Sequence, residues 1–180
     1  MCNKGKGLVQ ARSLYDAPLE MVFDPNMQDY KIPDYGFKRL RSISNFHFGV
    51  EYLSVSKKPP SFPVEGLILG NNRMLINLCC SVAHFGSESE PRSWRNVLFI
   101  LNTGSPTTFL STQAIEKFVG YQDGPTRLRI HTDRVQEAYP APRRSQFTEL
   151  NILGMDFLQD QKVRTITEPK NCTFILDASA

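Results

Sequence analysis

One short run of the chain ends an apolar stretch with polar side chains that do not titrate near neutral pH. Leu98–Leu101 is apolar, and Asn102, Thr103 and Gly104 follow it before Ser105-Pro106 begins a turn. An amide and a hydroxyl can donate and accept hydrogen bonds, but an amide cannot take a proton from water at neutral pH. The run predicts a polar turn at the end of a buried strand, without a general base.

A second motif follows towards the C-terminal end, in the run Asn151-Ile152-Leu153-Gly154-Met155-Asp156-Phe157-Leu158. A glycine between apolar residues and a polar one suits a close contact between two backbone segments. The first motif is followed by Ser-Pro-x-Thr-x-Leu and then by a predicted helix. This order makes the two motifs specific as a pair, although each alone is common.

Together the motifs resemble the retropepsin-like aspartic proteases of retroviruses, retrotransposons and their domesticated cellular relatives, over about residues 72–177. The resemblance implies that Asn102 occupies the place of the catalytic aspartate, which shares a proton with its copy from a second subunit. It implies that Thr103 bridges to the opposing turn and that Gly104 permits the two turns to approach. It also implies that Ile152, Leu153 and Gly154 pack behind the turn and hold it rigid. An acid or amide at Asp156 would orient the short helix that follows.

The chain departs from the family in two ways. A dimer with two copies of Asn102 has no general base, and loss of a base typically lowers the rate about 10²- to 10⁴-fold. In addition, members of the family have a flap, a long hairpin that follows the helix and closes over the substrate. Aligning the predicted hairpin over 128–139 with the family's hairpin after the flap leaves only Tyr121–Pro125 for the flap itself. Five residues are too few for two strands and a turn.

Three interpretations of function stay open at this point. We favour a catalytically inactive domain of this fold that acts as a homodimeric protein- or peptide-binding module. The alternative is an active aspartic endopeptidase whose catalytic Asp has been replaced, so the sequence leaves enzymatic status open. The third is an unrelated small β-domain in which Asn102-Thr103-Gly104 is an incidental turn, far from Ile152-Leu153-Gly154.

The surrounding pattern predicts a mainly β fold, a small closed barrel of the acid-protease type with one or two short helices. The strongest helix follows Ser111 or Thr112, which can cap it, and ends at Gly120. Apolar and alternating runs predict strands over 74–82, 97–101, 107–110 and 172–176, a hairpin over 128–139, and a short helix near residue 155. We expect Trp94 to pack in the core, and His131, Glu137 and Glu149 to be exposed.

Residues 1–66 differ in amino-acid composition from residues 67–180. Six prolines and many aromatic residues occupy the first region, which predicts an irregular arm without long helices that lies on the main domain or on a partner. Lys57–Pro60 is the predicted linker. The retropepsin-like domain is expected over 67–180.

Composition limits the remaining classes. The 21 basic and 18 acidic residues give a formal charge of only +3 and form no basic patch, so we expect no nucleic-acid partner. No apolar stretch is long enough for a membrane span, and no secretion signal is evident, so we expect an intracellular, cytoplasmic protein. Neither the histidines nor the four cysteines have metal-ligand spacing; we expect free thiols, no metal and no cofactor.

Overall fold

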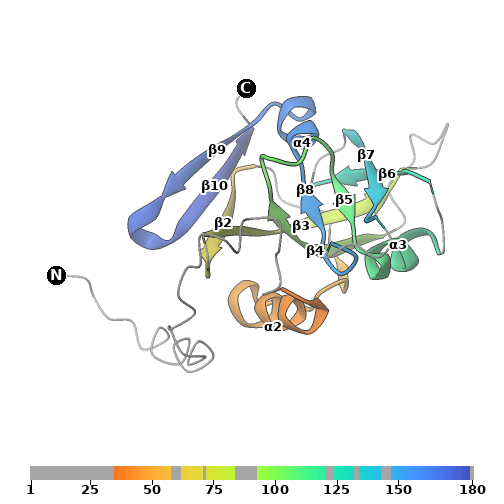
Figure 1. Cartoon of the computed structure of the whole chain (residues 1–180), viewed down its shortest axis with the longest axis horizontal. Helices are drawn as coiled ribbons and strands as arrows, with labels where there is room; N and C mark the ends of the chain where they lie inside the picture. Colours follow the sequence, from red (N-terminus) through yellow and green to blue (C-terminus); the bar gives the residue numbers. More distant parts are fainter. Residues whose placement is uncertain are drawn as a thin grey trace, which may run out of the picture. The chain divides into compact units, whose positions relative to one another are not determined.

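The computed structural model describes residues 35–57, 62–70, 72–83, 93–120, 124–131, 134–142 and 147–178. These residues are mainly β, which confirms the predicted fold class (Figure 1). The helices are α2 (Phe37–Phe48), α3 (Thr112–Val119), α4 (Met155–Asp160) and the 3-10 helix η2 (Pro169–Asn171). The strands are β1 (Val55–Ser56), β2 (Val64–Leu69), β3 (Arg73–Val82), β4 (Trp94–Leu101), β5 (Phe109–Leu110), β6 (Thr126–Ile130), β7 (Val135–Pro140), β8 (Ile152–Leu153), β9 (Val163–Glu168) and β10 (Thr173–Ala178).

Six of the strands pair in a closed circuit. The pairings run from β4 through β8, β5, β7, β6 and β3 and return to β4. The long strand β3 makes this possible, because it pairs with β4 along one edge while β2 and β6 share its other edge. From β2 the sheet continues outward through β10 to β9. The six-strand circuit agrees with the small β-barrel expected from the sequence.

The strand β4 is buried on both faces, as its uninterrupted apolar sequence predicts. Trp94 at its start is buried among core side chains, which confirms its predicted packing role. The helix α3 also has its predicted ends. The Ser111 hydroxyl accepts a hydrogen bond from Ala114 N, and Gly120 follows the helix with φ of 74°.

The helix α2 lies in the region where proline density had led us to expect no long helix, and that expectation is wrong for residues 37–48. The prolines lie outside this stretch, since none occurs between Pro33 and Pro59. Leu40, Ile43 and Ser44 form a buried stripe at helical spacing.

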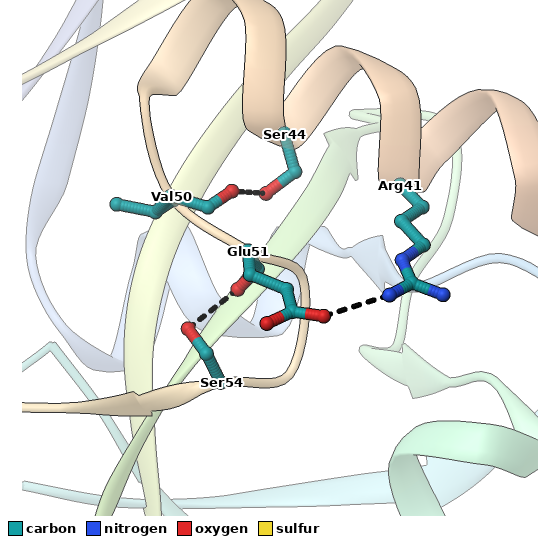
Figure 2. Close-up of polar contacts among 5 residues, drawn as sticks. All are labelled: Arg41, Ser44, Val50, Glu51 and Ser54. Carbon is teal, nitrogen blue, oxygen red and sulfur yellow. Dashed lines mark hydrogen bonds and ion pairs between the residues drawn. The ribbon is translucent and has the colours of Figure 1, made fainter.

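Past the helix, the chain turns back through Gly49 in the left-handed conformation. Figure 2 shows the contacts that fix the turn: Ser44 Oγ donates to Val50 O at 2.8 Å, Arg41 pairs with Glu51 at 2.8 Å, and Ser54 Oγ donates to Glu51 O.

The described part of the expected arm packs on the rest of the domain. Tyr35 and Tyr52 are buried, and Leu53 N and Ser54 O make backbone hydrogen bonds to Asn96 in β4. Pro33–Ala180 forms one compact unit, and the predicted division at residue 66 falls inside it, within β2. Residues 1–34 and most of the predicted linker lie outside the described residues.

Candidate functional site

The turn after β4 places Asn102 half-buried and leaves Thr103 and Gly104 exposed. Asn102 N donates to Leu153 O at 3.0 Å, which anchors the start of the turn. The side-chain Oδ1 accepts from Gly104 N at 3.0 Å, and the backbone carbonyl of Asn102 accepts from Ser105 N at 3.0 Å. Asn102 therefore uses its amide oxygen to close the turn on itself, in the manner of an Asx turn.

The two sequence motifs lie side by side. β8 pairs in parallel with the end of β4, with Ile100 opposite Ile152 and Leu101 opposite Leu153. If Asn102-Thr103-Gly104 were an incidental turn in an unrelated β-domain, it would lie far from Ile152-Leu153-Gly154. The pairing of β4 with β8 contradicts that separation. Ile152 and Leu153 therefore lie beside the end of the strand that leads into the turn.

Gly154 is the position at which this segment approaches another backbone segment most closely. A Cβ at this position would lie 2.5 Å from the backbone C and O atoms of Thr107, much closer than van der Waals contact. By contrast, a Cβ at Gly104 would meet only Asn102 Oδ1, at 3.3 Å. Within one subunit, close backbone approach therefore requires the glycine at 154 more strictly than the glycine at 104.

The carboxylate of Asp156 is the centre of the polar contacts below the turn. It accepts from Thr108 N at 2.9 Å, Thr108 Oγ1 at 2.7 Å, Gln136 Nε2 at 3.1 Å and Phe157 N at 2.7 Å. Thr108 Oγ1 in turn accepts from Gly154 N at 3.1 Å. These bonds join the segment after the turn, β7 and the first turn of α4. The helix-orienting role expected for Asp156 fits this geometry.

A second buried network holds the segment that leads into β8. Asn151 is fully buried; its Nδ2 donates to Tyr52 OH at 2.6 Å and to Leu98 O at 3.0 Å, and its Oδ1 accepts from Ser111 N at 2.9 Å. The hydroxyls of Tyr52 and Ser111 also share a hydrogen bond at 3.2 Å. Burial raises the pKa of Tyr52. This network ties the segment that follows α2 to the strand behind the turn.

Sequence reasoning did not assign roles to Gln136, Thr108, Asn151 or Tyr52. For Gln136 a signal was available, because it alternates in register with Ala138 and so faces inward on β7. The partners of Asn151 come from three distant parts of the chain, and no local pattern identifies them.

His131 lies at the end of β6 and is 5% exposed, so the prediction of an exposed hairpin tip is wrong. Its ring packs edge-to-face on Phe62 with centroids 5.2 Å apart, and neither ring nitrogen has a hydrogen-bond partner among the residues that the structure describes. Burial lowers its pKa to about 4. Glu137 and Glu149 are exposed as predicted, and Glu149 also accepts a hydrogen bond from Phe37 N at the start of α2.

The side chains of the turn can donate and accept hydrogen bonds, but none of them can act as a general acid or base near neutral pH. Residues 102–108 include no carboxylate, and both oxygens of Asp156 are occupied by donors. Across the described ranges, no cluster of histidine, cysteine and acidic residues could hold a metal ion. Cys79, Cys80 and Cys172 are free cysteines. In the described part of the chain, no helix has the length and apolar character of a membrane span.

The sequence matches no family model and no curated protein. A solved structure that resembles the chain is a retropepsin-like aspartic protease from Rickettsia conorii. The two are 13% identical, with a TM-score of 0.44, and the match covers 69% of this chain and 97% of that one. This similarity concerns the fold alone.

Proposed function

We propose that this chain is a retropepsin-like domain that does not cleave peptides and that acts as a homodimeric module for binding a protein or peptide. The observation that supports this most strongly is the turn at Asn102. It lies at the end of a buried strand, directly against the Ile-Leu-Gly segment, and carries an amide where catalysis in this fold needs a carboxylate.

Chemistry at such a site depends on two carboxylates that share one proton. One removes a proton from water, and the other donates to the carbonyl of the scissile bond. In Asn102 the amide oxygen already accepts from Gly104 N, and the amide nitrogen has no proton affinity near neutral pH. The side chain preserves the hydrogen bonding of the turn without the base.

The number of turns supports a homodimer. A two-turn site needs two chains, since the chain contains one Asn-Thr-Gly run with a supporting Ile-Leu-Gly segment. Thr103 and Gly104 are exposed, so they are accessible to a second turn.

The short segment available for a flap favours the same proposal. Only residues 120–125 separate the end of α3 from β6, and 121–123 lie outside the described residues. A site without a covering hairpin excludes water poorly and holds substrate weakly, which suits reversible binding better than hydrolysis.

The test restores the carboxylate. Asn102→Asp and the natural protein are assayed for cleavage of a peptide library at pH 4–7, with Asn102→Ala as the matched control, and their mass in solution is measured by sedimentation. We expect a dimer and no cleavage from any of the three proteins. Pepstatin-sensitive cleavage by Asn102→Asp alone, at least about 10²-fold above the control, would favour an endopeptidase whose acid has been replaced. A monomer would contradict the homodimer.

A further inference from the structure

The side chain of His131 is enclosed at the end of β6 without a polar partner. It is 5% exposed, and among the described residues neither Nδ1 nor Nε2 has a hydrogen-bond partner. A neutral imidazole carries one donor and one acceptor, so burying both without partners costs free energy. The ring packs instead on the ring of Phe62. Most buried polar side chains in proteins do have partners, so this one calls for an explanation.

The contact between His131 and Phe62 joins segments that lie far apart in the sequence. Phe62 precedes β2, whose first residue, Val64, pairs with Leu176 on β10. On the other side of the contact, His131 N donates to Cys79 O at 2.7 Å, which holds the histidine against β3. The ring therefore connects the entry to β2 with the pair formed by β3 and β6.

Among the described residues around the ring, no group could stabilise its charged form. Neither β3 nor β6 contains an acidic residue. Burial raises the pKa of Cys79, which stays a neutral thiol, and Arg129, two residues before His131, is itself positive. On the β2 side, Glu65 is the acidic residue nearest to Phe62 in the sequence, and it is exposed. An imidazolium in this place would be a buried charge with two donors and no acceptor.

We propose that His131 and Phe62 form an acid-sensitive latch, in which protonation of the imidazole drives the ring out of its site and releases the residues that lead into β2. In the closed form the neutral ring stays packed on Phe62. In the open form water reaches both ring nitrogens and stabilises the added proton. The inference is independent of the homodimer and of the turn at Asn102.

The direction of the pH effect follows from which form binds the proton better. Burial lowers the pKa of His131 from 6.5 to about 4 in the closed form, so the open form takes up the proton at a higher pH. Between pH 7.5 and pH 5, the ratio of open to closed molecules should therefore rise about 30-fold. Above pH 7.5 the ratio should be constant.

Native-state hydrogen exchange in the full-length protein tests the latch. Exchange is measured at both pH values and corrected for its intrinsic pH dependence. For residues 62–65 and the amide of His131, we expect protection to fall about 30-fold. This exchange should depend little on urea below the unfolding transition, because a local opening exposes little surface. Amides in the middle of β4, such as that of Phe99, should be better protected and should show the strong urea dependence of global unfolding.

Three variants separate the titrating ring from its contact. His131→Asn removes the ring and suits the left-handed backbone, where φ is 58°, so protection at 62–65 should stay constant between the two pH values. His47→Asn, the same replacement in α2, is the matched control and should keep the full pH effect. Phe62→Leu should increase opening about two- to tenfold at pH 7.5 and keep the pH dependence, because it weakens the contact and leaves the titrating group.

Two results would overturn the latch. If residues 62–65 and His131 showed the same protection and urea dependence as β4, the ring would be released only by global unfolding. If the pH effect at 62–65 persisted in His131→Asn, another group would be responsible for it. Neither result bears on the oligomeric state, so the proposed function would stand or fall separately.

Discussion

The turn at Asn102 and the cluster around Asp156 use their polar side chains differently. Asn102 accepts one side-chain hydrogen bond, from within its own turn, and its two following residues are exposed. Asp156 accepts four, and they join three elements of the chain. The negative charge of Asp156 lies where it joins these elements, and the turn at Asn102 carries none. Different residues therefore close the turn and hold the elements around it together.

Replacing Asp156 tests the structural half of this comparison and should have the largest effect. Asp156→Ala leaves Thr108 N, Thr108 Oγ1 and Gln136 Nε2 without their acceptor, and we expect a loss of about 3 kcal/mol in the free energy of unfolding. Urea denaturation measures it. Asn102→Ala, which removes one exposed turn contact, should cost less than about 1 kcal/mol. Equal losses in the two variants would remove the distinction between the regions.

The two glycines provide a second comparison. Gly154→Ala pushes a methyl group to 2.5 Å from the Thr107 backbone, and we expect a loss of about 2 kcal/mol, since backbone atoms cannot move aside easily. Gly104→Ala meets only a side-chain oxygen at 3.3 Å, so the free subunit should lose much less. Melting temperatures of both variants would show it. If Gly104→Ala proved the more harmful, the turn would be the more constrained region within a subunit.

The pH dependence of stability should come from outside both regions. The folded protein keeps His131 neutral, with its pKa lowered from 6.5 to about 4, so its contribution to stability is full above pH 6.5. As the pH falls from 6.5 towards 4, the unfolded chain binds the proton first, and we expect a loss of about 2 kcal/mol.

Unfolding titrations at several pH values in this window, with His131→Asn for comparison, measure this effect. Asparagine suits the left-handed backbone at this position, where φ is 58°. The variant should lose most of the slope. A slope that persists in His131→Asn would place the titrating group elsewhere.

The parts of the fold that were predictable carry their signal within a few neighbouring residues. β4 was recognised from an unbroken apolar run, α3 from its cap, its apolar stripe and its terminal glycine, and the hairpin β6–β7 from two alternating runs. The two site motifs were recognised for the same reason, because each is a contiguous run.

The incorrect and the missing predictions have two causes. α2 was missed because prolines were weighed over the whole of residues 1–66, although none interrupts residues 34–58. His131 was misplaced, and Asn151 left without a role, because burial and hydrogen-bond partners depend on segments far away in the sequence. The polar strand β9 has no apolar pattern of its own and gains its place from pairing with β10.

The bond from Asn151 to the hydroxyl of Tyr52 has a practical consequence for anyone who shortens this polypeptide. A fragment that starts at residue 67 would contain every motif of the site and yet lack the tyrosine that steadies it, along with the apolar cover from Tyr35, Leu40 and Ile43. Expression trials should therefore start upstream of Tyr35, and weak binding by a shorter piece would say little about the intact molecule.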